Sequence, residues 1–244
     1  MDVLVVGAGE MGRWFARSVG AAADGVAFAD VDRAAAEVAA AEVGGDVVAL
    51  DGEERADVVC VAVPMRLTAA AIADHAGRAR EALVDLSGAM AGPVAAMAEH
   101  APDVERASFH PLFGPGNAPG RIAAVTGADG PTVERLRGVL ADAGNDLFET
   151  TPEEHDTAME TVQARTHAAL LAFALADEDV PEPFGTPIYD RLESLVAEFL
   201  SGTPRVYADV QTTFEGAEDV AAAAERVAQA DHETFEELYR SASE

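Results

Sequence analysis

The stretch Val3-Leu4-Val5-Val6-Gly7-Ala8-Gly9-Glu10-Met11-Gly12 decides the fold of this chain. Its first four residues are all apolar, which is typical of a strand buried on both faces. The glycines that follow have the spacing G-x-G-x-x-G, and Arg13 to Val19 has the pattern of a helix. Strand, glycine turn and helix in this order predict the first unit of a doubly wound, parallel α/β sheet.

The same turn predicts a dinucleotide-binding site. Gly7, Gly9 and Gly12 allow, in turn, a tight bend, close approach of a pyrophosphate and close packing of the helix. Glu10 and Met11 lie at the helix start, where free N–H groups and the helix dipole attract phosphate. A bare G-x-G-x-x-G is a weak signal, but its position between a strand and a helix strengthens it.

An acidic residue at the end of the next strand bears on which cofactor binds. The strand Val26 to Asp30 places Asp30 18 residues after Gly12, close to the spacing of a ribose-binding carboxylate. A carboxylate there accepts from the ribose hydroxyls and repels a 2′-phosphate. We therefore expect NAD rather than NADP, although the nearby Arg33 weakens that preference.

Strand and helix patterns alternate as far as residue 150, as in a parallel sheet covered by helices. The expected strands are 47–50, 57–63, 83–86, 105–109, 122–126 and 146–149, and the expected helices are 33–43, 68–78, 92–100 and 131–143. We assign residues 1–150 to an NAD-binding Rossmann domain.

The pattern changes at Thr151, where a capping box, Thr151-Pro152-Glu153-Glu154, starts a long helix. Strand signals then largely cease. The expected helices are 152–176, 188–200, 204–214 and 218–239. Residues 151–244 are thus expected to form an all-α domain that binds substrate and dimerises.

Composition and charge exclude several classes of protein. The 244 residues contain no apolar run long enough to span a membrane and start with no basic leader, and the single cysteine, Cys60, lies in an apolar run. No disulfide within the chain and no cysteine-based zinc site is expected, and we expect a cytoplasmic protein without a metal. The net charge of −28, with 16 basic residues that are all arginine, disfavours nucleic-acid and membrane partners and resembles proteins of salt-loving cytoplasms.

The run Ser108-Phe109-His110-Pro111-Leu112-Phe113-Gly114-Pro115-Gly116 contains the first candidate for chemistry. His110 titrates near neutrality and follows a predicted strand, where α/β sheets keep their ligands. The simpler interpretation is a turn whose histidine only ends the strand.

Further candidates lie in the helical half. Met159, Gln163 and His167 are four residues apart and therefore share one helix face, which could equally be a core face. His155 and Asp156, near the helix start, are interpreted as local capping.

Taken together, these motifs resemble the prephenate dehydrogenase family of tyrosine biosynthesis over nearly the whole chain. The stretches that carry the resemblance are Val61-Ala62-Val63-Pro64, His110-Pro111-Leu112-Phe113-Gly114-Pro115, Glu154-His155-Asp156, Gln163-Ala164-Arg165-Thr166-His167, Pro187-Ile188-Tyr189-Asp190-Arg191-Leu192-Glu193 and Val206-Tyr207-Ala208-Asp209-Val210. The resemblance implies that Val63 and Pro64 line the cofactor site and that NAD is the cofactor.

The resemblance also implies roles for individual residues. His110 matches the catalytic histidine that hydrogen-bonds the ring hydroxyl of the substrate. Arg191 matches the arginine that pairs with a substrate carboxylate, and His167, with Gln163, matches a second substrate anchor. Similar dehydrogenases form homodimers through the helical region, so a homodimer is expected.

The chain departs from the family at one motif. The usual Asp-x-x-Ser-x-Lys is replaced by Asp85-Leu86-Ser87-Gly88-Ala89-Met90, in which the serine comes one position early. Ser87 is expected either to reach the catalytic site because Gly88 relaxes the backbone, or only to cap the next helix.

The implied reaction is the oxidative decarboxylation of prephenate to 4-hydroxyphenylpyruvate, with hydride transfer to NAD. It requires an acceptor for the hydroxyl proton, for which neutral His110 is suited, and an anchor for a carboxylate, for which Arg191 is suited. The alternatives are arogenate dehydrogenase, a pyrroline-carboxylate or imine reductase, and a nucleotide-sensing Rossmann protein without catalysis.

Overall fold

The structure is a computed structural model that describes residues 1–243, without the side chains of Pro115 and Glu182. The chain forms two compact units, Met1–Asp156 and Thr157–Glu244. The predicted boundary after residue 150 lies just before helix α6 (Pro152–Met159), whereas the first unit extends into that helix.

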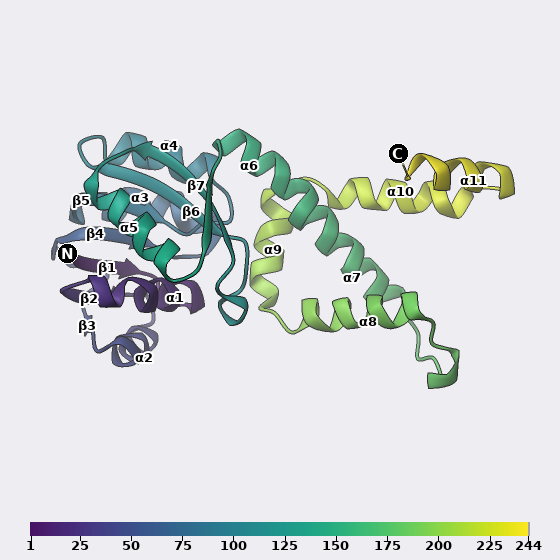
Figure 1. Cartoon of the computed structure of the whole chain (residues 1–244), viewed down its shortest axis with the longest axis horizontal. Helices are drawn as coiled ribbons and strands as arrows, with labels where there is room; N and C mark the ends of the chain where they lie inside the picture. The colour runs from purple at the N-terminus through teal and green to yellow at the C-terminus, as the bar shows by residue number, and fades with distance from the viewer. Residues whose placement is uncertain (244) are drawn as a thin grey trace. The chain divides into compact units, whose positions relative to one another are not determined.

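The first unit is built on one sheet of eight strands, drawn in purple to teal in Figure 1. The strand order is β3-β2-β1-β4-β5-β6-β7-β8, with a crossover after β3 as in a doubly wound fold. The strands are β1 Asp2–Val6, β2 Gly25–Ala29, β3 Asp46–Val47, β4 Ala56–Val61, β5 Ala79–Asp85, β6 Glu105–Pro111, β7 Arg121–Ala128 and β8 Asp146–Glu149.

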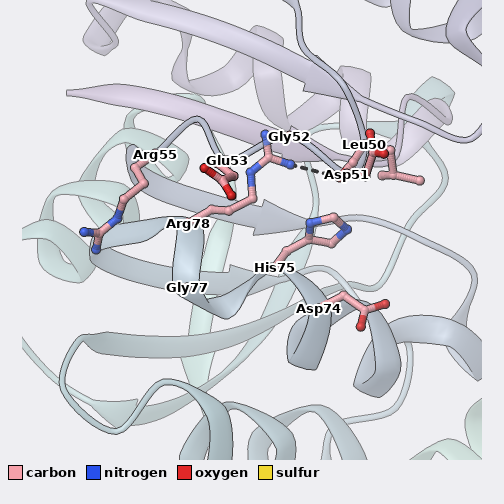
Figure 2. A pocket seen from close by; sticks show the side chains of 9 residues that line it. All are labelled: Leu50, Asp51, Gly52, Glu53, Arg55, Asp74, His75, Gly77 and Arg78. Carbon is pink, nitrogen blue, oxygen red and sulfur yellow. Dashed lines mark hydrogen bonds between the residues drawn. The ribbon is translucent and has the colours of Figure 1, made fainter.

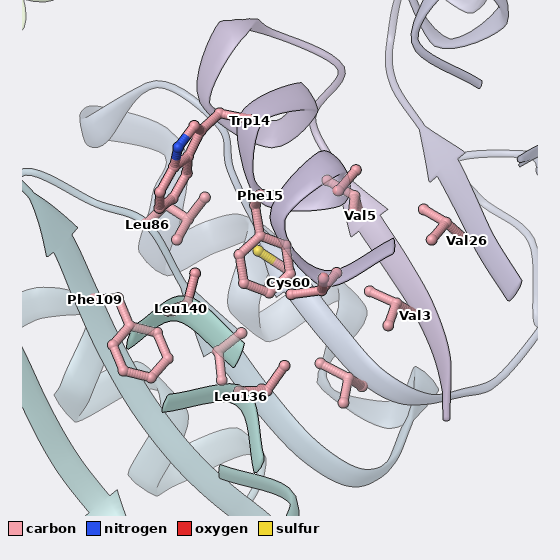
Figure 3. Close-up of a cluster of buried hydrophobic side chains, with 14 of the residues drawn as sticks. Val3, Val5, Trp14, Phe15, Val26, Cys60, Leu86, Phe109, Leu136 and Leu140 are labelled. Carbon is pink, nitrogen blue, oxygen red and sulfur yellow. The ribbon is translucent and has the colours of Figure 1, made fainter. Parts of the chain in front are cut away.

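Helices cover both faces of this sheet because alternate residues of each strand bury apolar side chains on opposite sides. Val3 and Val5 belong to the core that packs under α1, α2 and α5 (Figure 3), whereas Leu4 and Val6 belong to the core under α3 and α4. These helices are α1 Glu10–Val19, α2 Arg33–Val43, α3 Thr68–His75, α4 Ala91–His100 and α5 Pro131–Asp142. The Rossmann-type α/β fold is therefore confirmed.

Two strands run against the predicted direction. β7 pairs with β6 in antiparallel register, with His110 opposite Ala123, while the other strand pairs are parallel. Because β8 is parallel to β7, both strands run opposite to β1–β6. The physical reason is the short connection between β6 and β7, which contains only one 3₁₀ turn (Pro115–Asn117) and no crossover helix. The His110 motif begins in β6, which contains His110 and Pro111, and continues into this connection.

The second unit contains helices only, among its described residues. After α6 the chain makes a π-helical segment (Glu160–Arg165) and continues as α7 (Thr166–Ala176). The remaining helices are α8 Pro187–Leu200, α9 Pro204–Thr213, α10 Ala217–Gln229 and α11 His232–Ser241. No helix in residues 1–243 has the length and apolar character needed to cross a membrane.

The single helix predicted over 218–239 is wrong, because the chain turns between α10 and α11. Ala230 and Asp231 have extended backbone, and the Asp231 side chain accepts a 2.9 Å hydrogen bond from the Thr234 N–H. Asp231 thus caps the start of a new helix, which competes with continuing the old one.

Candidate active site

The glycine turn after β1 has the geometry that a dinucleotide requires. Gly7 has φ +107°, and a Cβ there would lie 2.2 Å from the Ala62 carbonyl oxygen. A Cβ on Gly12 would lie 2.1 Å from the Gly7 carbonyl oxygen, so both positions exclude a side chain. Gly9, in contrast, has no atom within 4 Å of such a Cβ. The open space over Gly9, at the N-terminus of α1, fits a pyrophosphate.

The other residues predicted to bind the cofactor lie around this turn. Val63 and Pro64 lie just after β4, and the N–H of the intervening Ala62 donates a 2.7 Å hydrogen bond to the Val6 carbonyl beside the turn. Glu10 is an exposed residue in the first turn of α1, and Met11 packs partly against the core.

Asp30, the residue after β2, hydrogen-bonds to the backbone of the glycine turn. Its carboxylate accepts hydrogen bonds from the Ala8 N–H at 2.7 Å and from the Asp32 N–H at 2.8 Å. Each carboxylate oxygen has a further lone pair for a ribose hydroxyl. Arg33 is paired with Glu37 at 3.0 Å on the exposed face of α2.

His110 lies near the end of β6, at the same carboxyl edge of the sheet. Its side chain is buried, and its Nδ1 is 2.8 Å from Nε2 of His155, on α6. Burial lowers the pKa of His110 to about 3, with a further lowering from the charge of His155 and a partial opposing effect from Asp156. The imidazole is therefore neutral at neutral pH, as a proton acceptor must be.

The hydrogen-bonded chain continues from His155 to Asp156. The Nδ1 of His155 is 2.8 Å from Oδ1 of Asp156. Both carboxylate oxygens of Asp156 also accept from the start of α4, at 2.9 Å from the Met90 N–H and 3.0 Å from the Ala91 N–H. Burial acts to raise the pKa of Asp156, but these hydrogen bonds outweigh it and hold the pKa below its ordinary value. The assignment of this pair to capping of its own helix is thus wrong, because Asp156 caps α4 and His155 bonds His110.

The loop after β5 passes beside the other side of His110. A Cβ on Gly88 would lie 3.5 Å from Nε2 of His110 and 2.6 Å from the terminal methyl of Met65. Ser87, the residue before, is buried, and its hydroxyl accepts a 3.3 Å hydrogen bond from the Ala89 N–H. The backbone of Gly88 therefore lies next to the imidazole, while Ser87 supports the turn before α4.

A separate pocket lies at the opposite edge of the sheet (Figure 2). It is lined by residues that precede β4 and β5, among them Arg55 and Arg78. The Arg78 guanidinium donates hydrogen bonds to two backbone carbonyls, that of Glu54 at 3.0 Å and that of Leu50 at 3.2 Å. This pocket is remote from the carboxyl edge, where parallel sheets place their chemistry. Among residues 1–243, no cluster of three His, Cys, Asp or Glu side chains is placed to hold a metal.

Known proteins are similar to this chain in sequence and in fold. Residues 15–127 match the family model described as prephenate dehydrogenase, nucleotide-binding domain. A 4-amino-4-deoxyprephenate dehydrogenase of Streptomyces pristinaespiralis is 32% identical over 97% of this chain and 88% of its own length. The chain belongs to the prephenate dehydrogenase family. It is thus a dehydrogenase, an oxidoreductase, with a nucleotide-binding domain.

More distant members agree with this assignment. A probable arogenate/prephenate dehydrogenase of Methanocaldococcus jannaschii is 26% identical over 85% of this chain, which spans half the length of that protein. The solved prephenate dehydrogenase from A. aeolicus, in complex with hydroxyphenyl propionate and NAD⁺, has a TM-score of 0.72 at 17% identity. It covers 98% of this chain and 95% of its own, which shows a common fold.

The other predicted site residues of this family member lie in the second unit. His167 on α7 packs its ring against Phe199 and Tyr207, with centroid distances of 5.4 and 4.9 Å. Its Nδ1 is buried without a hydrogen-bond partner in the part of the chain described, and burial lowers the pKa of His167. Arg191 lies on the exposed surface of α8.

Gln163 belongs to the π-helical segment, which changes the spacing that the predicted stripe assumed. The Ala164 carbonyl in this segment accepts a 2.8 Å hydrogen bond from the side-chain amide of Gln211 on α9. Gly216, with φ +152°, also packs here, since a Cβ would lie 2.9 Å from Cγ of Arg165. Such segments often occur at functional sites, and this one ends two residues before His167.

Sequence reasoning missed the contributions of His155, Asp156 and Gly88. The Glu154-His155-Asp156 motif was part of the family resemblance, and it was the available signal for the first two. For Gly88 the signal was its place in the altered run after Asp85.

Proposed function

We propose that this chain catalyses the NAD-dependent oxidative decarboxylation of prephenate to 4-hydroxyphenylpyruvate in tyrosine biosynthesis. The observation that carries the proposal is His110, a buried imidazole that stays neutral and lies at the sheet edge shared with the glycine turn. A neutral imidazole can take the proton of the ring hydroxyl as the ring carbon is oxidised. NAD, when bound, supplies the acceptor for the hydride.

The chain's own residues are then assigned to binding and proton transfer. Gly7, Gly9 and Gly12 would hold the pyrophosphate, and Asp30 the ribose. Arg191 would pair with one carboxylate of the substrate, and His167 with Gln163 would anchor the second. Residues 1–150 would thus bind the cofactor, and residues 151–244 the substrate.

Two other substrates of the same ring type are candidates. Arogenate differs from prephenate in the side chain, which carries an amino group. The most informative relative, at 32% identity, is named for 4-amino-4-deoxyprephenate, in which an amino group replaces the ring hydroxyl. A neutral His110 can accept a proton from nitrogen as well as from oxygen.

An assay with purified protein in molar KCl tests the proposal directly. Each of the three substrates is offered with NAD and with NADP, and formation of the reduced cofactor is followed by absorbance. We expect the highest kcat/KM with prephenate and NAD. A higher kcat/KM with either amino compound would identify that compound as the substrate. Binding of NAD without any turnover would favour a nucleotide sensor.

Two substitutions separate binding from chemistry. Arg191→Gln should raise KM for prephenate far more than it lowers kcat, because it removes an anchor used in both the ground and transition states. His110→Asn should lower kcat by about 100-fold or more while NAD affinity stays intact. Wild-type turnover by His110→Asn would exclude this site.

We also propose that the chain acts in the cytoplasm as a homodimer. Cys60 is a free, buried thiol, which suits a reducing compartment. Several large apolar side chains of the second unit are exposed, including Leu175, Ile188 and Leu195 at 79%, 79% and 52%. Helices with such stripes commonly bury them against a partner. Light scattering in molar KCl should give twice the chain mass, and a monomer mass would exclude the dimer.

A further inference from the structure

Three side chains that are ionisable or charged lie in one hydrogen-bonded line behind the active-site histidine. The line runs from Nδ1 of His110 to Nε2 of His155 at 2.8 Å, and from Nδ1 of His155 to Oδ1 of Asp156 at 2.8 Å. We propose that His155 and Asp156 form a relay that fixes the tautomer of His110 and receives the proton it takes from the substrate. This inference rests on the proposed function for its substrate, but its geometry does not depend on which substrate is used.

The hydrogen-bond roles along the line follow from its far end. Asp156 already accepts two backbone N–H bonds at the start of α4, so it is an ionised acceptor. The Nδ1 of His155 must therefore carry the hydrogen that points at Asp156. In a neutral ring this leaves the lone pair of His155 on Nε2, which then accepts from Nδ1–H of His110. The lone pair of His110 is consequently on Nε2, the nitrogen beside the Gly88 backbone.

The burial of His110 explains why a second acceptor is needed. The imidazolium of His110 is strongly disfavoured, since its pKa lies near 3. His155 is equally enclosed, with a side chain only 1% exposed, but it is in direct contact with a carboxylate. A positive charge on His155 is therefore neutralised by Asp156, whereas one on His110 is not.

The proton transfer balances as follows. The substrate O–H bond breaks, and its proton forms a bond to Nε2 of His110. The Nδ1–H bond of His110 breaks in the same direction, and that proton bonds to Nε2 of His155. The two electrons of the substrate C–H bond leave as hydride to NAD⁺, and the bond to the carboxylate breaks to release carbon dioxide and make the ring aromatic. The result is a neutral His110 and a His155 cation paired with Asp156.

The proton held by the relay returns to the product. The electrons of the broken bond to the carboxylate make the ring aromatic and leave its oxygen as a phenolate. That oxygen takes the proton from Nε2 of His110 while the proton on Nε2 of His155 returns to Nδ1 of His110, which restores both starting tautomers. Until then the charge on His155, whose side chain is only 1% exposed, is balanced by Asp156. Asp156 and His155 act through His110 and are positioning residues in this scheme.

Two substitutions of His155 separate the functions of the relay. Gln places an amide oxygen where it can accept from Nδ1–H of His110, so it preserves the tautomer but cannot take a proton. Leu removes both functions. We expect His155→Leu to lower kcat by about 100-fold or more and His155→Gln to lower it by about tenfold, with KM changed less than about threefold in both. His232→Gln, at a histidine with a 91% exposed side chain on α11, is the matched control and should behave as wild type.

Nitrogen NMR of histidine-labelled protein supplies a readout that needs no substrate. In the wild type at neutral pH, we expect His110 to be neutral with hydrogen on Nδ1, and Nδ1 of His155 to carry the hydrogen that points at Asp156. His155→Gln should keep this tautomer of His110, and His155→Leu should lose it while the circular dichroism spectrum stays unchanged.

The outcomes distinguish this inference from the proposed function. If no substrate is turned over, the proposed function fails, and the NMR tautomers alone decide the relay. A His110 with hydrogen on Nε2 in the wild type would overturn the relay, as would wild-type kcat in His155→Leu. If His155→Leu and His155→Gln lower kcat and melting temperature equally, and the tautomer of His110 is unchanged in both variants, His155 is only a packing residue and the relay is excluded.

Discussion

Asp85 is a fully buried carboxyl group that should make the stability of the first unit depend on pH. It is the last residue of β5, and its Oδ1 accepts a 2.8 Å hydrogen bond from the Ser87 N–H. Burial raises the pKa of Asp85 from 3.8 to about 7, because the Ser87 N–H and the neighbouring Ser108 hydroxyl offset only part of the desolvation.

The sign of the effect follows from proton binding in the two states. In the unfolded chain Asp85 ionises near pH 3.8, whereas in the folded chain it keeps its proton up to about pH 7. Its contribution to stability is therefore fully present below pH 3.8 and is lost as the pH rises to about 7. A difference of roughly three pKa units corresponds to on the order of 4 kcal/mol.

Replacing Asp85 with Asn keeps an oxygen that can accept from Ser87 and removes the ionisation. We expect the gain in unfolding free energy of Asp85→Asn over wild type to be about 3 kcal/mol larger at about pH 8 than at about pH 4.5. Urea unfolding in molar KCl at both pH values measures this gain. Asp103→Asn, in the exposed turn before β6, is the control and should show no such difference. An Asp85→Asn effect that is the same at both pH values would refute the reasoning.

Three further predictions concern the cofactor, salt and Ser87. Because the Asp30 carboxylate repels a 2′-phosphate, kcat/KM should be higher with NAD than with NADP, and the reverse order would exclude this role. Because the net charge is −28 and the Debye length falls from about 10 Å at 0.1 M salt to about 3 Å at 1 M, the unfolding midpoint and activity should rise into molar KCl, and a flat or falling midpoint would contradict this. Because the Ser87 hydroxyl accepts from the Ala89 N–H, Ser87→Ala should lower the melting temperature with kcat changed by less than about threefold, and a loss of tenfold or more in kcat would instead place Ser87 in the site.

Short sequence patterns predicted most of the helices and strands, because these elements depend mainly on residues that are neighbours in the sequence. The run Val3 to Val6, the glycine turn and the helix after it each follow from neighbouring residues, and the structure has all three. The predictions failed where a distant element or a single side chain decided the outcome. The direction of β7 depends on the short connection from β6, and the break between α10 and α11 depends on the Asp231 cap.

The amino-acid sequence by itself determined the α/β class and the dinucleotide turn, and it singled out His110 as a candidate catalytic residue. These follow from side-chain period, glycine spacing and the titration range of imidazole, which need no knowledge of distant neighbours. Only the tertiary structure showed that His155, 45 residues after His110, lies 2.8 Å from it. Residues this far apart in the sequence come together only when the chain folds. Folding also buries His110, which no local pattern encodes, and this burial keeps its imidazole neutral.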